Sequence, residues 1–463
     1  MSQVSASTRA SANPYAYDPA AVEEPPRSIA GALRRIGPGM LLTAAIVGTG
    51  ELIATTRLGA DVGFVMLWAI LGSCLIKTVV QAVWGRYTIV TGETAMSAMN
   101  HVPGPRLLGV NWLCWSWAAM TLLAISLIGA MYAGAAQVMA RAVPGIPLGV
   151  WVVALAGLTL FALLGGTYRR IERMTVWMVA TFTLMTVFAA GVLTGYPEYF
   201  TWRAAGEGLL FGLPEEGIVI AIAVFGITGV NSGELFAYPY WCVEKGYARF
   251  TGPRENSEAW RRRAAGWIRV MHFDILVSML VYTLATVAFY FLGAGVLHTL
   301  GRIPEGDETI QVLSAMYSET MGEFGLYLFY VGALFVLYST IFSATAANSR
   351  IFADLARLAG AFGQDDHASR VRWQNLLIVG LTLIPCAVYF GTGEPVQMVK
   401  AGGIVLALML PVIAVSVVYL RHRRLPQDVV PGPLVTATLW LVSALTVVTM
   451  SAFALMQLGV LAR

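Results

Sequence analysis

Two glutamates in apolar sequence are the residues of this chain best suited to chemistry. Glu51 lies in GTGEL (48–52) and Glu234 in NSGEL (231–235), so the letters GEL occur in both halves of the chain. A charged side chain at the centre of a membrane helix costs roughly 2.5–3.5 kcal/mol on insertion scales. A cation, a proton or a water-filled cavity lowers that cost. The repeated Gly-Glu therefore predicts a site for a cation or a proton.

Glycines surround both glutamates. Gly48 and Gly50 flank Thr49 in the first segment, and 226–233 contains three glycines in the second. Glycine is a poor helix former, and a helix that unwinds inside a membrane exposes carbonyl groups that need a cavity or a ligand. We therefore expect two interrupted helices. An alternative is that each glutamate caps the N-terminus of a half-helix, where its charge suits the helix dipole. A capping carboxylate can still face a ligand.

The elements that position these residues are predicted to be membrane helices. Hydrophobic residues make up 57% of the 463 residues and charged residues only 12%, about half the charged share of soluble proteins. Apolar runs of roughly 20 residues recur along the chain, as a bilayer about 30 Å thick requires. We predict an all-α polytopic membrane protein. The expected spans are 37–57, 63–90, 108–138, 148–166, 172–195, 214–243, 267–296, 322–349, 373–391, 395–420 and 433–460.

The two interruptions fall in the first and sixth of these eleven spans. That placement suits a five-plus-five inverted repeat with broken helices 1 and 6, in which substrate binds between the two broken helices at mid-membrane. We assign 31–196 to the first repeat, 197–421 to the second and 422–463 to an extra eleventh helix. Residues 1–30 are rich in Ser, Ala and Pro and are predicted to form a disordered tail.

The distribution of Lys and Arg predicts the orientation. Most of them fall in connections on the side of the N-terminus, whereas the opposite connections hold few, which indicates a cytoplasmic N-terminus and an outer C-terminus in the plasma (inner) membrane. Because these residues lie in short loops, no nucleic-acid partner is expected; the partner is the lipid bilayer. No nucleophile–base set or nucleotide loop indicates an enzyme. Oligomeric state stays open.

Several segments resemble the Nramp divalent-metal transporters. These are GPG at 37–39, GADVGFVMLW at 59–68, and IPEGDETIQVLSAMYSETMGEFGLYLF at 303–329. The resemblance covers most of the chain and implies the LeuT-type inverted-repeat fold. It also implies transport of manganese, iron or related divalent ions, usually together with protons.

The chain departs from the family pattern at the metal site. The family's DPGN falls on 48–51, its MPH on 233–235, and its glutamine of span ten on Met409; an acidic pair of span three falls on Ser126 and Gly129. Loss of the methionine thioether and gain of carboxylate oxygens favour a hard ion such as magnesium or manganese over softer metals. Loss of the acidic pair leaves proton coupling open.

We therefore predict a secondary transporter that moves a divalent metal cation by alternating access, with no resident cofactor. Glu51 and Glu234 are the expected metal ligands. An alternative is a carrier of an organic solute such as an amino acid or amine, because Gly-Thr-Gly is similar to segments that hold a carboxylate on exposed amides. Two facing acids favour a cation instead. The predicted binding residues are Gly48, Thr49, Gly50, Glu51, Val230, Asn231, Ser232, Gly233, Glu234 and Met409.

Each of the other polar residues in the spans has two possible interpretations. Lys77 either pairs with a carboxylate or snorkels to the interface, and Lys400 is either an outer gate charge or an interfacial lysine. His272 and Asp274 either relay protons or form a satisfied interfacial pair. The hydroxyls of span eight either line a pathway or pack helices together; they belong to Ser339, Thr340, Ser343 and Thr345.

Overall fold

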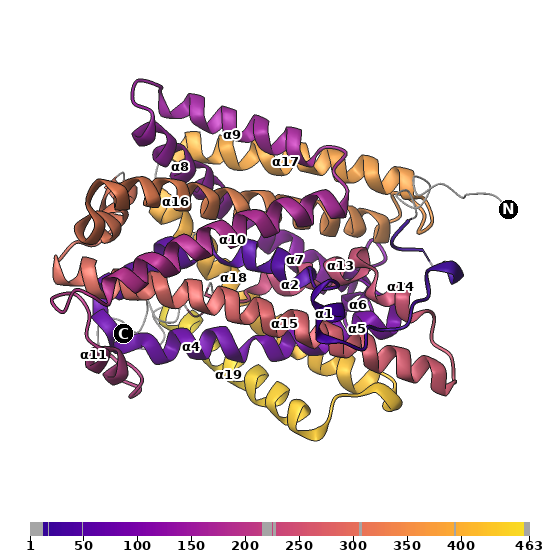
Figure 1. Cartoon of the computed structure of the whole chain (residues 1–463). Helices are drawn as coiled ribbons and strands as arrows, with labels where there is room; N and C mark the ends of the chain where they lie inside the picture. The colour runs from indigo at the N-terminus through magenta and orange to yellow at the C-terminus, as the bar shows by residue number, and fades with distance from the viewer. Residues whose placement is uncertain are drawn as a thin grey trace.

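The protein is a bundle of helices that run roughly along one direction (Figure 1). Its structure is a computed structural model that describes residues 13–16, 18–48, 50–214, 225, 228–304, 308–392 and 395–457. The first half contains η2 (Pro19–Ala21), α1 (Ile29–Leu33), α2 (Pro38–Ile46), η3 (Gly50–Thr55), α3 (Thr56–Val62), η4 (Gly63–Met66), α4 (Leu67–Ile76), α5 (Thr78–Thr91), α6 (Ala95–Met99), the antiparallel pair β1 (Arg106–Leu107) and β2 (Val110–Asn111), α7 (Trp112–Leu123), α8 (Ile125–Ala142), α9 (Leu148–Leu163), α10 (Tyr168–Leu193) and α11 (Trp202–Glu207).

The second half of the chain also consists mainly of long helices. It contains α13 (Ser232–Lys245), α14 (Tyr247–Thr251), α15 (Glu258–Leu292), η5 (Gly293–Leu297), α16 (Thr309–Leu358), α17 (His367–Thr392), α18 (Pro395–Arg423), η7 (Gln427–Val429) and α19 (Pro433–Gln457). The helix α2 contacts α10, α13, α15 and α16, so the start of the first interrupted helix lies at the centre of the bundle. The pair α9 and α17 forms one edge, and α19 packs on α18 and α5 at another (Figure 1).

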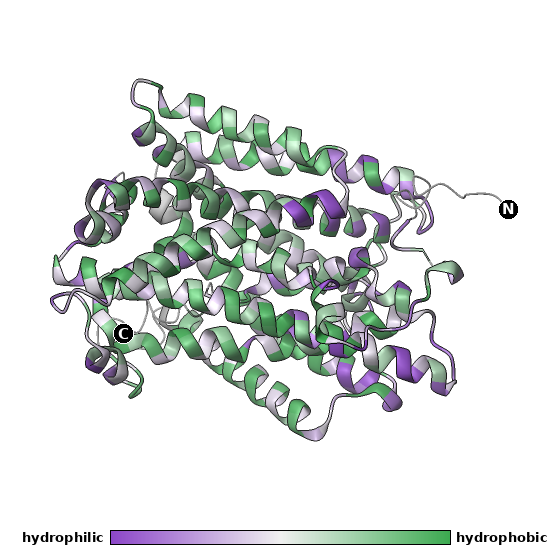
Figure 2. Cartoon of the chain, in the orientation of Figure 1, coloured by the Kyte–Doolittle hydropathy of each residue, from purple (hydrophilic) through white to green (hydrophobic). Residues whose placement is uncertain are grey.

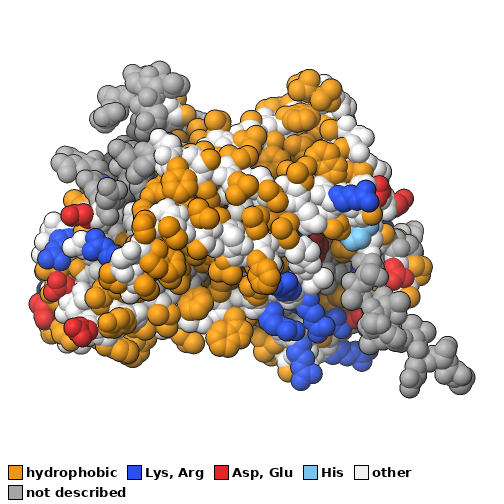
Figure 3. Space-filling view, turned by 90° about the horizontal axis from the view of Figure 1, so that it is seen from above, with side chains coloured by type: hydrophobic (Ala, Val, Ile, Leu, Met, Phe, Trp, Pro, Cys, Tyr) orange, Lys and Arg blue, Asp and Glu red, His pale blue; other side chains and the backbone are white. Residues whose placement is uncertain are grey.

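The prediction of an integral membrane protein agrees with the surface of the bundle. Eight helices in the described part of the chain are long and apolar enough to cross a membrane, and Leu148–Leu163 is a shorter apolar helix. Large apolar side chains such as Phe161 (76% exposed), Trp177 and Leu184 point outward along the bundle, as lipid-facing residues do. Figure 2 shows hydrophobic sequence along the lengths of the helices, and Figure 3 shows charged side chains gathered toward the two ends.

Several predicted spans are divided by local breaks. The second is divided at Lys77, between α4 and α5, and the third at Ala124, between α7 and α8. Within α16, Gly322 has φ +61° and ψ −143°, so the 50 residues form two helices that meet at this glycine. Only a residue without a side chain adopts that conformation freely. Residues 215–224, which belong to the predicted sixth span, lie outside the described residues.

The prediction of a disordered tail over residues 1–30 is wrong for the part that the structure describes. Glu23 donates its N–H to the carbonyl of Phe250 at 3.0 Å and accepts at its own carbonyl from the Trp267 indole at 2.9 Å. Its carboxylate pairs with Arg35 at 2.6 Å. These contacts hold the segment before α1 against α14 and α15. Composition alone missed them, because they depend on partners more than 200 residues away in the sequence.

Tyr15 fixes the start of this docked segment. Its hydroxyl donates to Glu244 Oε1 at 2.6 Å, and the guanidinium of Arg370 lies 4.1 Å from the centre of its ring. The same glutamate pairs with Arg350 at 2.8 Å. Burial raises the pKa of the Tyr15 phenol well above its usual value, and the charge of Glu244 raises it further. Tyr15 therefore stays protonated and remains a hydrogen-bond donor.

Replacing Tyr15 by phenylalanine is expected to release the segment before α1. The variant loses one hydrogen bond to a charged group, which is ordinarily worth about 1.5–3 kcal/mol, while Glu244 keeps its pair with Arg350. Amide hydrogen exchange should become faster over residues 13–24. Tyr327→Phe, at a side chain that is 65% exposed, is the matched control and should change nothing. Equal protection in both variants would contradict this role for Tyr15.

Candidate functional site

The first interrupted helix breaks between α2 and η3, at the glycines that the sequence singled out. Val47 leaves helical geometry (φ −80°, ψ 68°), and a π-helical turn begins at Gly50. The Thr55 hydroxyl donates to the carbonyl of Gly50 at 3.0 Å and so satisfies one of the groups that the break releases. The prediction of a broken first helix is confirmed. Thr49 lies outside the described residues.

Gly48 allows the broken helix to pack closely against α16. A Cβ atom built on Gly48 would collide with the side chain of Thr340. The Thr340 hydroxyl donates at 2.8 Å to the carbonyl of Ala44, which lies one turn before the glycine. The glycine that stands where the family has aspartate therefore lets α16 approach the broken helix closely.

Gly48→Ala is expected to destabilise the protein by about 1–3 kcal/mol, the usual cost of overpacking a tight contact. Thr340→Ala in the same chain should recover part of that loss, because it removes two of the three nearest atoms. Thermal unfolding of the two single variants and the double variant gives the coupling energy between the sites. Strictly additive losses would contradict the contact.

The second interruption ends at the N-terminus of α13. Gly229 has φ +66°, and a side chain there would press on the backbone of Cys74. Asn231 caps α13: its side chain accepts from the N–H of Gly233 at 2.7 Å, and its own N–H donates to Glu234 Oε2 at 3.2 Å. This reciprocal pair is a capping box. The capping interpretation of Glu234 is therefore confirmed.

Glu51 joins the two interruptions. Its Oε1 accepts from the N–H of Gly229 at 3.1 Å, so a residue of the first broken helix holds the backbone of the second. The side chain is fully buried, and Oε2 has no hydrogen-bond partner among the described residues. A buried carboxylate oxygen without a partner is costly. A cation or a proton at this oxygen would offset that cost.

Lys77 holds the peptide that links Thr228 to Gly229, on the side opposite to Glu51. Its ammonium group donates to the carbonyl of Phe225 at 2.6 Å and to that of Thr228. The Ser73 hydroxyl donates to the same two carbonyls at 3.2 and 3.0 Å. The peptide between Thr228 and Gly229 is thus fixed at its carbonyl by Lys77 and at its N–H by Glu51. Lys77 is thus held inside the bundle, but its hydrogen-bond partners are backbone carbonyls and not the carboxylate that we predicted.

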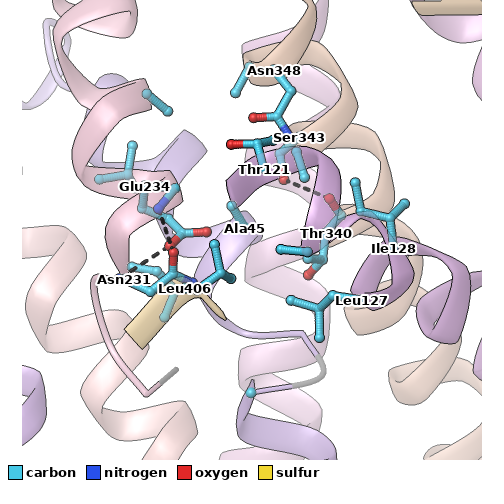
Figure 4. A pocket seen from close by; sticks show the side chains of 18 of the residues that line it. Ala45, Thr121, Leu127, Ile128, Asn231, Glu234, Thr340, Ser343, Asn348 and Leu406 are labelled. Carbon is cyan, nitrogen blue, oxygen red and sulfur yellow. Dashed lines mark hydrogen bonds between the residues drawn. The ribbon is translucent and has the colours of Figure 1, made fainter. Parts of the chain in front are cut away.

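A cavity of about 80 Å³ lies where the two interruptions meet. Figure 4 shows Glu234 and Asn231 on one side of it and Thr340 and Ser343 of α16 on the other. The cavity is lined by Leu42, Ala45, Ile46, Gly50, Thr121, Ala124, Leu127, Ile128, Met131, Asn231, Gly233, Glu234, Ala237, Trp241, Thr340, Ser343, Ala344, Ala347, Asn348 and Leu406. Along α13 it extends from Glu234 to Trp241, toward the end of the bundle where α13 and α16 finish in basic residues.

The cavity gathers only part of the predicted binding set. Gly50, Asn231, Gly233 and Glu234 line it, whereas Gly48, Glu51, Val230, Ser232 and Met409 do not. Val230 and Met409 are buried in the core, and the Ser232 hydroxyl donates to the carbonyl of Leu406 at 2.9 Å. Among the predicted hydroxyls of span eight, Thr340 and Ser343 line the cavity and Ser339 and Thr345 do not.

The sequence analysis did not predict that residues of α7 and α8 line the cavity. Thr121, Ala124 and Ile128 face the cavity because the helix is broken at Ala124, and no glycine or proline marks that break. Trp241 and Asn348 also line the cavity and were not predicted to do so. A polar Asn in an apolar helix was the signal that could have identified the second of them.

Of the two positions that correspond to the family's acidic pair, Gly129 has no room for a side chain. A Cβ atom on Gly129 would lie 2.6 Å from the carbonyl oxygen of Pro385 in α17, so this glycine is needed for close helix packing. Ser126 donates weakly to the carbonyl of Met398 at 3.4 Å. Asp274 accepts the N–H groups of Gly37 and Gly39 at 2.8 and 2.7 Å. It therefore caps the start of α2, whereas His272 is exposed. The side chain of Lys400 lies outside the described side chains.

The cavity offers mainly oxygen ligands, with one thioether from Met131. In the described part of the chain, no group of three or more His, Cys, Asp or Glu side chains is placed to hold a metal ion. A cation in the cavity would meet the Glu234 carboxylate, the Asn231 side chain, the hydroxyls of Thr340 and Ser343, and water. At roughly 30 Å³ for each water molecule, the cavity has room for an ion that keeps part of its hydration shell.

Comparisons with known proteins agree on a family. The family model for natural resistance-associated macrophage protein-like (Nramp) proteins matches residues 39–456. The divalent metal cation transporter MntH of Bradyrhizobium diazoefficiens is 24% identical over 428 residues, which cover 89% of this chain and 87% of the relative. MntH 1 of Pseudomonas aeruginosa is 24% identical over 384 residues, with 81% and 80% covered.

Solved structures show the same fold. A manganese transporter variant of Eremococcus coleocola superposes with a TM-score of 0.67 at 17% identity, and covers 94% of this chain and 88% of its own. MhsT in complex with L-phenylalanine gives a TM-score of 0.56 at 14% identity, with 95% and 100% covered. The closed Mhp1 transporter of the nucleobase-cation-symport-1 family gives 0.55 at 13%, with 94% and 96% covered. The predicted LeuT-type arrangement is thus confirmed as a fold; the count of eleven helices stays a prediction.

Proposed function

Because this chain belongs to the natural resistance-associated macrophage protein-like (Nramp) family, we propose that it is a secondary transporter of a divalent metal cation, not an enzyme. The observation that carries the proposal is the Glu234 carboxylate in a small polar cavity between two interrupted helices. Relatives over most of the chain bear the name divalent metal cation transporter. The chain itself supplies a negatively charged, oxygen-rich cavity of the kind that such a cation needs.

The proposed cargo is a hard ion, magnesium or manganese. Carboxylate, amide and hydroxyl oxygens suit these ions, whereas a thioether or several imidazoles would favour softer metals. One thioether, that of Met131, lines the cavity, but the oxygen-bearing side chains of Glu234, Asn231, Thr340 and Ser343 outnumber it. A cavity of about 80 Å³ admits an ion with part of its water shell, which matters for magnesium because it gives up water reluctantly.

We assign direct or water-mediated coordination to Glu234 and, although its side chain does not line the cavity in this structure, to the unpartnered Oε2 of Glu51. Gly50, Asn231 and Gly233 shape the cavity beside them. Thr49 completes the proposed set, together with Gly48, Val230, Ser232 and Met409 as its supporting residues. Two carboxylates would give the site enough charge to compensate for a divalent ion in a low-dielectric setting.

Transport proceeds by alternating access in this proposal. Residues 31–196 and 197–421 form the two inverted repeats, residues 422–463 form the extra helix, and the interrupted helices move against the rest. The N-terminus is cytoplasmic and the C-terminus is outside, as the distribution of Lys and Arg favours. The cavity reaches toward the basic end of α13 and α16, so it opens toward the cytoplasm. No resident cofactor takes part. The acidic pair of the family's usual proton route is absent, because Ser126 and Gly129 stand at its two positions.

The organic-solute alternative is less well supported. Cavities that bind organic ligands usually measure about 300–1,000 Å³, several times the volume of this one. The Gly-Thr-Gly segment that suggested the alternative includes Gly48, whose packing against Thr340 accounts for it without a ligand.

The proposed function is tested by cation flux. Wild-type protein in proteoliposomes should take up magnesium or manganese saturably, and an internal pH probe should show whether protons move with the ion. L-amino acids and simple amines in excess should leave the flux unchanged. Competition by these solutes, or no flux of either ion by well-folded protein, would contradict the proposal.

A further inference from the structure

A cleft rich in arginine lies between the segment before α1 and the start of α15. It measures about 800 Å³, and its walls include Arg27, Ser28, Ile29, Arg262 and Arg269. All three guanidinium groups are exposed, and none forms an ion pair with a carboxylate in the described ranges. Glu24 also lines the cleft, so three cationic groups stand against one anionic group. The cleft therefore has the charge to attract an anion.

The position of the cleft relative to lipid follows from α15. Leu276, Leu280 and Leu284 are 46%, 53% and 56% exposed, and their spacing of four residues places them on one face of the helix. Arg269 and Arg262 continue this face at steps of seven residues, or two helical turns each. Arg269 lies about 10 Å along the axis from the first exposed leucine at 1.5 Å per residue.

The opposite wall also faces the membrane boundary. Ile29 is 73% exposed and Leu33 48% exposed, although both belong to the short helix α1 that packs beside α15. Large apolar side chains beside exposed arginines are typical of a surface at the boundary between acyl chains and headgroups. Figure 1 shows α1 over α15 near the end of the bundle from which the N-terminus leaves.

We propose that this cleft binds the phosphate headgroup of an anionic phospholipid whose acyl chains lie along the exposed leucine face of α15. Arg27, Arg262 and Arg269 hold the phosphate through charge-assisted hydrogen bonds. The leucines contact the acyl chains. A bound lipid would join the segment before α1 to α15 and thereby strengthen the docking that Glu23 and Tyr15 begin. Basic pockets at the ends of membrane helices recognise such headgroups by this chemistry.

The experiment measures lipid retention by the purified full chain. Wild-type protein, the triple variant Arg27→Gln/Arg262→Gln/Arg269→Gln, and a charge-matched control, Arg169→Gln/Arg170→Gln/Arg173→Gln, are incubated with dioleoyl phosphatidylglycerol or dioleoyl phosphatidylcholine. Native mass spectrometry then counts the lipids retained. The three control arginines are exposed at the start of α10, so the control changes the same net charge elsewhere.

Wild type and the control should retain phosphatidylglycerol in preference to phosphatidylcholine. The cleft variant should lose that preference, with an apparent affinity at least about tenfold lower for the loss of three cationic contacts. Each single substitution should give part of the effect, which guards against poor folding of the triple variant. Retention should fall as salt is raised.

Three results would overturn the proposal. Equal retention by the cleft variant and wild type would remove the arginines from lipid binding. An equal loss in the control variant would mean that net charge alone matters. Inorganic phosphate that protects wild-type protein from unfolding as well as phosphatidylglycerol does would assign the cleft to a soluble anion and not to a lipid.

Discussion

Replacing Glu234 by glutamine is expected to abolish divalent-cation uptake while the protein stays folded. Glutamine keeps an oxygen that can accept from the N–H of Asn231, so the capping box survives. It removes the negative charge from the cavity, and with it the group that compensates for the ion. Loss of an outer-shell partner already costs 10–100-fold in metal affinity, so uptake should fall by at least about a hundredfold. Radioactive manganese flux into proteoliposomes measures it.

The control for this variant is Glu323→Gln, at an exposed glutamate beside the kink of α16. It changes the same charge on the surface and should keep full uptake. Glu51→Gln should fall between the two, because an amide oxygen can still accept from Gly229 while the unpartnered oxygen is lost. Normal uptake by the Glu234 variant would remove this carboxylate from the transport site.

Replacing Lys77 by methionine is expected to cause the second large effect. The variant loses the ammonium group that holds the carbonyls of Phe225 and Thr228. It also leaves Glu51 buried without the positive charge that interacts with it. A hydrogen bond to a charged group is ordinarily worth about 1.5–3 kcal/mol, and the variant loses two of them. We expect a lower unfolding temperature and a loss of maximal uptake, because the link beside Gly229 is no longer held.

Ser73→Ala separates charge from hydrogen bonding at this link. The serine hydroxyl donates to the same two carbonyls, so its removal deletes neutral hydrogen bonds and leaves the lysine in place. Its cost should be about 1 kcal/mol, and uptake should persist. Thermal unfolding and flux measured on both variants give the comparison. An equal, small effect in the two would mean that the positive charge of Lys77 has no special role.

Much of the fold could be predicted from the sequence because a bilayer imposes simple rules. Apolar runs of the right length and glycine clusters at 48–50 and 226–233 predicted where helices would lie and where two of them would break. The breaks at Lys77 and Ala124 could not be predicted, since no helix-breaking residue marks either one. They depend on tertiary contacts, such as the carbonyls that reach Lys77.

The site was predicted in part for the same reason. Glu234 was identified because a carboxylate in apolar sequence is costly without a purpose, and Asn231 because it lies in the same glycine-rich interruption. The sequence could not show that Glu51 has a different position from these two residues. Its carboxylate accepts from the backbone of Gly229, and the side chain does not line the cavity. Met409 was carried over by alignment of a motif and proved to be a core residue. Which face of a helix meets the cavity is a property of packing.

Anomalous X-ray scattering from crystals grown with manganese would test the central claim most directly. The wild-type protein should show one strong manganese peak in the cavity, within coordination distance of the Glu234 carboxylate, and crystals of Glu234→Gln should lack it. A peak at another place with the cavity free of metal, or an unchanged peak in the variant, would contradict the assignment of this cavity as the cation site.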